Sequence, residues 1–415
     1  MSMPDRTEIR VAEYESVSLA LDQLSDTDLD RLRALHTCRR CTITSDRTGW
    51  TFTAGATVGV LALDRIRLII TPKVAFTGDS LLRWLCYATA TPVPHDATLR
   101  NWQTHRHGLP DLVAAALLAE CQTLLRDGLR RDYVRHDVIE PVLRGRLDIV
   151  AQATKRYGML DQLHSRTFDR AIDIWENQLC GLALRAARTV VADPHLARQL
   201  AQTAIEFPTT SAATRVLRTL DRTTYTRLNR RYRTAHLWSG LILRGGGVTD
   251  LLVNTGSNAE SLLLDMPVLW EAIVRRLIHD AAPAGVDIVP STGTSAITVH
   301  GDLSPRPPFR PDVLLQRTSG TQTPELYPID AKYKTYADHT VSTADIHQLL
   351  TYTAGYAPPA APVAAIVHPD PTATSQRTVR ITGNRRHLGT VHIHGVDTAA
   401  SPARAADGIR AALFT

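Results

Sequence analysis

The sequence predicts a mixed α/β protein with a β-rich N-terminal domain, a helical middle region and an α/β C-terminal domain, at residues 1–105, 106–245 and 246–415. Short runs of β-type residues fill the first part. In the second part, apolar residues recur at helical spacing. The third part contains two strand-like runs joined by turn residues, with helical patterns on both sides.

The composition is that of an ordinary globular protein, with 44% hydrophobic and 21% charged residues. A chain of 415 residues is long enough for two or three domains with separate cores. Its net charge of +6 permits a nucleic-acid partner without requiring one. No apolar run approaches the roughly 18 residues of a membrane span, and the N-terminus lacks a signal-peptide core. We therefore expect a cytoplasmic protein without membrane association.

The N-terminal part alternates short β-type runs with two helical segments. The predicted strands are Ile9–Tyr14, Thr51–Ala54, Val58–Leu63 and Arg67–Thr71. A cap at Ser25 predicts a helix that turns Leu29, Leu32 and Leu35 to one face. A second helix is expected at Asp79–Ala90, with Leu82, Leu85 and Cys86 facing inward.

The middle region reads as mostly helical. Pro110–Arg126 is an apolar helix that ends in C-cap style at Asp127–Gly128. Further on, helical spacing predicts four core residues, namely Ile172, Trp175, Leu179 and Leu182. Asp148 and Asn177 are interpreted as a cap or a buried hydrogen-bonding group, with a functional role as the alternative.

One stretch of the middle region is strongly basic. It contains seven arginines and two interleaved tyrosines, namely Arg215, Arg218, Arg222, Arg227, Arg230, Arg231, Arg233, Tyr225 and Tyr232. Basic residues with aromatics can follow a phosphate backbone. The alternative is a solvated helical face, for which Leu217, Leu220 and Leu228 would supply the apolar side.

A glycine run at Arg244–Gly247 marks a joint before the C-terminal part. The phosphate-binding pattern GxxxxGK[ST] is absent from the chain, so we expect it to bind and hydrolyse no nucleotide. The elements expected after the joint are a helix at Asp265–His279 with Leu269, Ile273 and Leu277 inward, a helix at Val341–Tyr356, strands at Pro362–His368 and Thr390–Val396, and a closing helix at Pro402–Phe414.

The cysteines and two histidines favour structural interpretations. Five cysteines in a chain of this length do not indicate a disulfide scaffold. Cys38 and Cys41 form a single CxxC without two further ligands at zinc-site spacing, so we interpret them as ordinary thiols. His392 and His394 are expected on a solvated strand face.

The most informative stretch is a predicted hairpin from Phe309 to Lys334, with strands at Phe309–Gln316 and Glu325–Lys334. Because strand residues two apart share a face, Asp330 and Lys332 lie together and Ala331 points away. If the strands pair, Asp312 approaches Asp330.

Two carboxylates beside an ammonium group are unfavourable to hold together without a cation. Hard oxygen ligands with room for water suit Mg²⁺, which can bind a phosphate and activate water. Only four of the 47 basic residues are lysines, namely Lys73, Lys155, Lys332 and Lys334, so two lysines within five residues indicate a need for a compact ammonium. The alternative is a solvated strand face that carries these charges by chance.

Pro311–Asp312 followed by Asp330–Ala331–Lys332 resembles the PD-(D/E)xK nuclease signature. Other segments resemble McrC, the nuclease subunit of McrBC-type modification-dependent restriction systems. They are IRVAEYESVSL, VGVLALDRIRLIITPKV, the RGRLD element and a D-x-x-x-N helix with Asp173 and Asn177. The resemblance extends from Ile9 to Tyr356.

This resemblance implies a PD-(D/E)xK restriction-endonuclease-like C-terminal domain that cuts double-stranded DNA when docked on a hexameric AAA+ GTPase, McrB. The front half, including residues 1–105, would contact and stimulate the GTPase, and the partner would recognise the modified base. The implied cofactor is Mg²⁺, with Mn²⁺ as a substitute. The implied site comprises the catalytic residues Asp312, Asp330, Lys332 and Glu271, the metal ligands Asp312, Asp330 and the Ala331 carbonyl, and the accessory or DNA-contacting residues Lys334, Gln348 and Tyr352.

Two other functions stay open from the sequence. A stand-alone repair or recombination nuclease would cut DNA with Mg²⁺ and no nucleotide. A regulatory subunit with a decayed site would stimulate the GTPase without cutting.

Overall fold

The computed structural model describes residues 7–73, 76, 80–90, 108–159, 161–243, 261–290, 296–301, 308–317, 324–337 and 339–414. The chain forms two compact units. Unit 1 combines Met1–Leu109, Asp250–Val253 and Leu263–Thr415, and unit 2 combines Pro110–Thr249 and Asn254–Leu262. The N-terminal and C-terminal parts therefore belong to one unit, while the predicted division into three domains stays a prediction.

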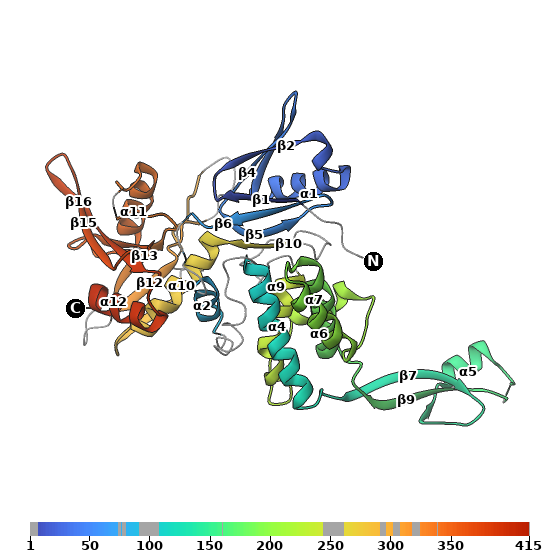
Figure 1. The fold of residues 1–415 in the computed structure, drawn as a ribbon. Helices are drawn as coiled ribbons and strands as arrows, with labels where there is room; N and C mark the ends of the chain where they lie inside the picture. The colour runs from blue at the N-terminus through green and yellow to red at the C-terminus, as the bar shows by residue number, and fades with distance from the viewer. Residues whose placement is uncertain are drawn as a thin grey trace. The chain divides into compact units, whose positions relative to one another are not determined.

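The front of unit 1 consists of two small sheets and a helix, coloured blue in Figure 1 except for the yellow strand β10. One sheet has the order β1-β6-β5-β10 and the other has the order β2-β4-β3. The elements are β1 (Thr7–Ala12), β2 (Ser16–Ala20), a short 3₁₀ turn η1 (Leu21–Gln23), α1 (Asp26–Thr37), β3 (Cys41–Ser45), β4 (Gly49–Ala54), β5 (Thr57–Ala62), β6 (Ile66–Thr71) and β10 (Ser261–Asp265). Strand β1 runs parallel to β6, whereas β5 with β6, β2 with β4 and β3 with β4 form antiparallel pairs.

Helix α1 begins as its sequence predicts. The Ser25 side chain accepts a hydrogen bond from the Asp28 amide, and the Asp28 carboxylate accepts one from the Ser25 amide. This capping box orients the helix so that Leu32 and Leu35 are buried and Leu29 packs beside them. Strands β2 and β3 were not predicted, because each is only five residues long and too short to give a clear periodicity of its own.

The C-terminal part of unit 1 is built on a six-stranded mixed sheet of order β11-β12-β13-β14-β16-β15. Its strands are β11 (Val286–Val289), β12 (Val313–Arg317), β13 (Glu325–Ala331), β14 (Val363–Asp370), β15 (Ser375–Gly383) and β16 (Arg386–Asp397). The three central strands β13, β14 and β16 are parallel, and the outer pairs are antiparallel. Parallel central strands need cover on both faces, and helices supply it.

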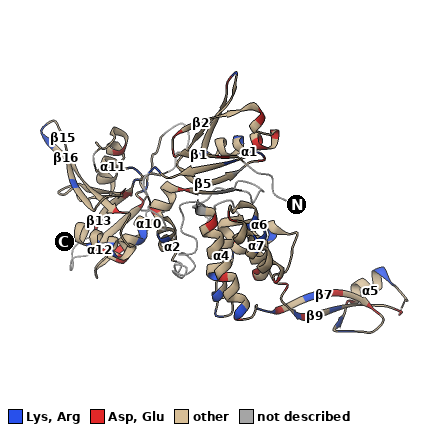
Figure 2. Ribbon diagram, viewed as in Figure 1, with Lys and Arg blue, Asp and Glu red and all other residues tan. Residues whose placement is uncertain are grey.

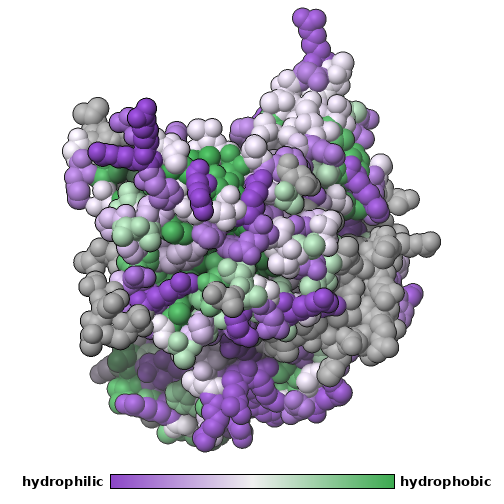
Figure 3. Space-filling model, turned by 90° about the vertical axis from the view of Figure 1, so that its left-hand side faces the viewer, coloured by the Kyte–Doolittle hydropathy of each residue, from purple (hydrophilic) through white to green (hydrophobic). Residues whose placement is uncertain are grey.

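Helix α11 (Thr343–Tyr356) covers one face of this sheet, and α10 (Met266–Ala281) and α12 (Pro402–Phe414) cover the other (Figure 1). Under α11, Leu349 and Tyr352 pack on Ile366 and Ile393 in one apolar cluster. All three helices were predicted, with bounds within two residues of the observed ones. Strand β15 was missed, although its exposure alternates along its length. The side of the molecule that carries β15 and β16 is mostly hydrophilic, with apolar residues in small patches (Figure 3).

Helix α2 (Ser80–Ala88) comes from the N-terminal part but contacts α10 and α12. Leu82, Leu85 and Cys86 are fully buried, as predicted. Trp84 is also fully buried, and its indole nitrogen donates to the Thr398 carbonyl at 2.9 Å. The N-terminal part thus contributes to the core behind the six-stranded sheet.

Unit 2 is a helical body with a three-stranded sheet of order β7-β9-β8 (Figure 1). Its elements are α4 (Gly108–Arg126), β7 (Asp132–Glu140), β8 (Arg146–Leu147), α5 (Ile149–Lys155), β9 (Leu163–Ala171), α6 (Trp175–Val190), α7 (Pro194–Ile205), α8 (Ala213–Asp221), the 3₁₀ turn η2 (Arg230–Tyr232) and α9 (Arg233–Leu243). Within this unit, the long pair β7 and β9 extends away from the helices and carries α5 at its end (Figure 1). The mostly helical prediction missed this extension, which we call the arm (residues 132–171).

Helix α4 ends where the sequence predicts. Gly128 has a φ of +79°, a conformation that favours glycine, and its amide donates to the Leu125 carbonyl at 3.1 Å. The next predicted helix is wrong at its start. Ile172 lies before α6, because the Ile174 amide bonds to the Ile172 carbonyl and the helix begins at Trp175. Leu179 is fully buried, whereas Ile172, Trp175 and Leu182 are only half-buried.

The prediction of a solvated strand face for His392 and His394 is wrong for His394. Strand β16 lies inside the sheet, between β14 and β15, so His394 is only 1% exposed and its ring stacks beside that of His392. Burial lowers the pKa of His394 to about 4 and also lowers the pKa of the half-buried His392.

Some predictions fall outside the described residues, namely the joint at Arg244–Gly247 and the turn at residues 318–323. Among the described residues, no helix is both long and apolar enough to cross a membrane.

Candidate active site

The hairpin of β12 and β13 brings the two predicted aspartates together. Val313 pairs with Ile329, so Asp312, one residue before, stands opposite Asp330, one residue after. The Ala331 amide donates a hydrogen bond to Asp312 Oδ2 at 2.6 Å and fixes that carboxylate at the strand end. The predicted approach of Asp312 to Asp330 is confirmed.

Lys332 completes this group. Its Nζ lies 2.8 Å from Asp330 Oδ2 and donates to Gln348 Oε1, also at 2.8 Å. Its main-chain amide donates to the Val367 carbonyl at 3.0 Å and keeps the chain beside β14. Asp330 and Lys332 therefore share a face, as strand alternation predicted.

The two aspartates of this group have raised pKa values, because burial and neighbouring negative charges disfavour their ionised forms. Burial, the nearby Asp330 and Glu271 raise the pKa of Asp312 to about 7. Burial also raises the pKa of Asp330, although Lys332 opposes the shift. For Lys332, burial alone would lower the pKa, but Asp330 outweighs it and the pKa rises. Lys332 is thus held as a cation, while the raised pKa of Asp312 lets its carboxyl group hold a proton up to about neutral pH.

Helix α11 supplies the support for Lys332. Gln348 accepts from Lys332 and donates through Nε2 to the Tyr352 hydroxyl at 2.8 Å. The Tyr352 hydroxyl in turn donates to the Arg310 carbonyl at 2.5 Å, so a chain of hydrogen bonds joins the two ends of the site. Tyr352 is buried, so its hydroxyl takes part in this chain of hydrogen bonds beneath the protein surface.

Asp345 is a member of this group that the list of predicted site residues missed. Its carboxylate lies 3.5 Å from Lys332 Nζ and 3.1 Å from Lys334 Nζ, and it also accepts hydrogen bonds from Tyr336 and Ser342. The hydroxyl and lysine bonds outweigh burial and lower its pKa to about 2. The available signal was its helical spacing from Gln348, together with two lysines that needed a counter-charge.

Glu271 and Lys334 lie at the margin of the group. Glu271, on α10, forms an ion pair with Arg275 at 2.7 Å, and Arg275 also donates to the Asp312 carbonyl at 3.1 Å. The charge of Glu271 contributes to the raised pKa of Asp312, so the two carboxylates lie close enough to repel each other. The Lys334 side chain is exposed and keeps its ammonium available at the surface.

The oxygen donors of this group fit a hard divalent cation. Asp312 and Asp330 offer carboxylates, and the Ala331 carbonyl is a third oxygen, while Mg²⁺ commonly retains several waters. Across the described ranges, no group of three or more His, Cys, Asp and Glu side chains is arranged to hold a metal ion. A cation here would therefore depend on these two aspartates, the carbonyl and water.

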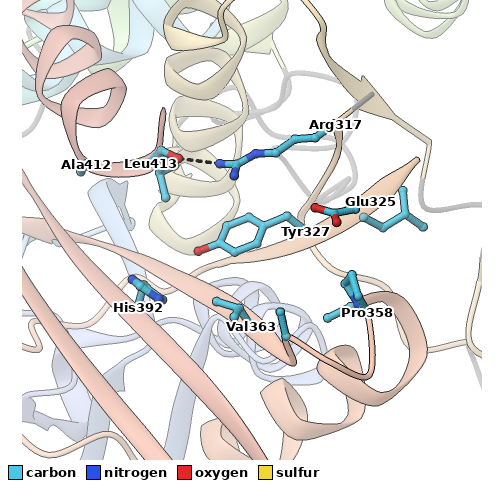
Figure 4. A pocket seen from close by; sticks show the side chains of 11 residues that line it. Arg317, Glu325, Tyr327, Pro358, Val363, His392, Ala412 and Leu413 are labelled. Atoms are coloured by element: carbon cyan, nitrogen blue, oxygen red, sulfur yellow. Dashed lines mark hydrogen bonds between the residues drawn. The ribbon is translucent and has the colours of Figure 1, made fainter. Parts of the chain in front are cut away.

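A cavity of about 260 Å³ lies elsewhere in unit 1, between β13, the loop after α11 and the end of α12 (Figure 4). Arg317 crosses it and donates to the Leu413 carbonyl at 2.6 Å, and Tyr327 and His392 line its walls. Asp312, Asp330 and Lys332 are not among its lining residues, so it is separate from the candidate site.

The other sequence candidates have structural roles. Asp148 caps α5 by accepting from the Ala151 amide. Asn177 is fully buried, donates to the Arg130 and Ile172 carbonyls, and accepts from the Tyr232 hydroxyl. Cys38 and Cys41 are free thiols.

In the basic stretch, all seven arginines are exposed, but the two tyrosines serve the fold. Tyr232 is buried and bonds to Asn177, while the Tyr225 hydroxyl lies 3.1 Å from His236 Nδ1. Arg231 donates to the Gly128 carbonyl at the end of α4. Base stacking by Tyr232 is therefore excluded, while a phosphate contact by the arginines and a solvated face both stay open as interpretations of this stretch.

Comparisons with known proteins identify a family for this chain and, separately, a similar fold. A family model described as "McrBC 5-methylcytosine restriction system component" matches residues 52–368. The fold is similar to a chain of a half-complex from a tetradecameric assembly of Thermococcus gammatolerans McrB AAA+ hexamers with bound McrC. The TM-score is 0.65 at 18% identity, over 98% of this chain and 99% of that chain.

A chain of the Thermococcus gammatolerans McrBC complex also matches, with a TM-score of 0.45 and 18% identity over 67% of this chain and 89% of that one. No curated protein matches. Because the family match spans residues 52–368 of the 415-residue chain, the protein belongs to the McrBC 5-methylcytosine restriction system component family, as the resemblance to McrC predicted.

Proposed function

We propose that the chain is the Mg²⁺-dependent endonuclease subunit of a McrBC-like restriction system. It would cleave foreign or modified DNA while bound to an AAA+ GTPase whose hydrolysis it stimulates. The observation that carries the proposal is the convergence of Asp312, Asp330 and Lys332 at one end of the hairpin, within hydrogen-bond distance of groups that orient them. Family membership supports the same conclusion.

The residues divide the chemistry of phosphodiester hydrolysis among them. Asp312, Asp330 and the Ala331 carbonyl would hold Mg²⁺, aided by Glu271. When bound, this ion would supply Lewis-acid stabilisation of charge that develops on the scissile phosphate. Mn²⁺, which accepts the same oxygen ligands, would serve as a substitute.

Lys332 would orient the attacking water and stabilise negative charge as the bond to phosphorus forms. Its ammonium is held between Asp330 and Gln348, which limits its freedom and fixes its direction. Lys334, exposed at the same edge, would contact a backbone phosphate. Together these residues define the surface of a PD-(D/E)xK-type site.

The surface of the arm of unit 2 supports the proposal that this chain binds a protein partner. Large apolar residues are exposed along it, namely Tyr133, Ile139, Val142, Leu143, Ile149, Val150, Tyr157, Met159 and Phe168. Charged residues of both signs lie between them along β7 and β9 (Figure 2). A concentration of exposed apolar side chains with a polar surround is typical of a protein-binding surface. We propose that the arm, together with the front sheets, docks on the GTPase.

The partner is required because this chain carries no nucleotide-binding loop. GTP hydrolysis must then occur on another subunit, which fits the similarity to a chain solved with McrB AAA+ hexamers. Recognition of the modified base is assigned to that partner as well.

The decisive experiment is plasmid cleavage with Mg²⁺ by the purified chain, alone and with its neighbouring AAA+ GTPase and GTP, on methylated and unmethylated DNA. We expect cutting only with partner, GTP and modified DNA. Cutting by the chain alone would establish a stand-alone nuclease, and GTPase stimulation without any cutting would establish a regulator.

Two variants tie cleavage to the site. Asp330→Ala and Lys332→Ala should each lower cleavage by about a thousandfold, because each removes a charge that stabilises the transition state. Folding and GTPase stimulation should persist. Glu325→Ala, which removes an exposed carboxylate from the same strand, is the matched control. Retained cutting by either site variant would remove that residue from the catalytic group.

A further inference from the structure

Glu13, directly after β1, is a buried carboxylate that reaches the candidate site from the N-terminal part. It is 2% exposed, and its amide donates to the Thr71 carbonyl at 3.0 Å, which continues the pairing of β1 with β6. Its Oε2 accepts two hydrogen bonds, from the Lys73 amide at 2.8 Å and from the Tyr333 hydroxyl at 3.0 Å. The carboxylate is thus fixed to the front sheet and to the residue between the two site lysines.

Tyr333 lies in a tight bend. Lys332 is held to β14 through its amide, and the Lys334 amide donates back to the Lys332 carbonyl at 2.8 Å. Tyr333 is buried and turns toward Glu13, whereas the ammonium groups of Lys332 and Lys334 both approach Asp345, at 3.5 and 3.1 Å. The Glu13 contact therefore holds the bend at the residue between the two lysines, while Asp345 pairs with the lysine side chains.

A contribution to the stability of the fold does not explain why a carboxylate occupies position 13. Burial is the largest influence on Glu13 and raises its pKa to about 7, so the charged form is disfavoured there. Among the described residues its Oε1 has no hydrogen-bond partner. A buried, incompletely bonded carboxylate is less favourable than an amide or an apolar group of the same size, which indicates a role other than packing.

We propose that Glu13 is a positioning residue of the candidate active site, which holds the Tyr333 hydroxyl and so fixes the bend that carries Lys332 and Lys334. The inference rests on the proposed nuclease function and extends it. The site is then shaped by both ends of the chain. Glu13 and Tyr333 then join the front sheets, which we expect to contact the GTPase, to the proposed catalytic residue Lys332.

The test measures single-turnover and steady-state DNA cleavage by the full complex for four variants. Tyr333→Phe and Glu13→Ala should lower kcat at saturating DNA and Mg²⁺ between about tenfold and a hundredfold, because misplacement of a catalytic group acts on the chemical step. KM for DNA and stimulation of the GTPase should stay unchanged. Glu13→Gln should keep most of the rate, since its amide oxygen accepts from the same two donors. Glu8→Ala, an exposed glutamate of β1, is the control.

The double variant Glu13→Ala with Tyr333→Phe should be no slower than the slower single variant, because both remove one contact. If Glu13→Ala fails to fold, Tyr333→Phe alone tests the inference, since this substitution deletes a single oxygen atom. If the wild-type complex cleaves DNA and Tyr333→Phe has the same kcat, this inference is overturned and the proposed function stands. Absence of cleavage by the wild-type complex would overturn both.

Discussion

Asp312 shows how the neighbours of one residue set its chemistry. Its carboxylate accepts a hydrogen bond from the Ala331 amide and stands opposite Asp330 in the hairpin. The negative charge of Glu271 also repels it. These surroundings raise its pKa to about 7, so near neutral pH the side chain exists in both protonation states. A divalent cation would compete with that proton.

We predict that Mg²⁺ binding to the chain depends on pH in a defined direction. Because the pKa of Asp312 in the folded chain is raised, the proton is retained below about pH 7 and must be displaced by the ion. The Kd for Mg²⁺, measured by calorimetry, should tighten by up to about tenfold between pH 6 and pH 7, and by less above pH 7.

The variant Asp312→Asn is the control for this titration, because its amide carries no titratable proton. Its weaker Mg²⁺ binding should change little over the same pH range. Equal Kd values for the wild-type chain at about pH 6 and about pH 8 would contradict the prediction.

At the scale of elements, the β12–β13 hairpin was the easiest part of the site to predict. Strand alternation and turn residues act over a few positions, so they place Asp330 beside Lys332 and bring Asp312 opposite Asp330. Helical spacing also groups Asp345 with Gln348, but the contacts of Asp345 with the two lysines and of Tyr333 with Glu13 could not be derived in this way. These contacts depend on where α11 and β1 pack, and no local pattern encodes that packing.

The arm exposes large apolar side chains that the fold of this chain does not explain by itself. Ile149 and Val150 at the start of α5 are 71% and 72% exposed. Ile149→Asp with Val150→Asp should weaken binding to the GTPase by at least about tenfold, because buried apolar anchors dominate interface energies. Binding is measured by calorimetry or interferometry.

The melting temperature of this double variant should stay unchanged, since exposed positions contribute little to stability. Ile205→Asp, an equally exposed isoleucine at the end of α7 and outside the arm, is the matched control and should bind normally. Normal partner affinity in the arm variant would exclude α5 from the interface.

At the scale of the whole molecule, unit 1 is discontinuous in sequence. Helix α2 brings Trp84 and its buried neighbours against α10 and α12, and β10 joins the front sheet before the chain enters α10. Arg40 and Asp265 add an ion pair between the front part and the start of α10, at 3.7 Å. The C-terminal segment is therefore incomplete without the N-terminal one.

We predict that residues 263–415 expressed alone will not form a stable fold, because the face that α2 covers would be exposed to water. Co-expression with residues 1–109 should restore a soluble, cooperatively melting complex. In the full chain, Trp84→Ala should lower the free energy of unfolding by about 3–5 kcal/mol. A cooperative thermal transition of the isolated C-terminal segment would contradict this prediction.

The sequence by itself determined the features that depend on short-range rules. These are the mixed α/β class, most helices, the hairpin and the aspartate–lysine group, because capping, periodicity and strand alternation each act within a few residues. Tertiary structure alone decided three others. It buried His394, bonded Tyr232 of the basic stretch to Asn177 inside unit 2, and brought Glu13 to Tyr333 across 320 positions. Such contacts depend on how distant elements pack, and no local pattern carries that information.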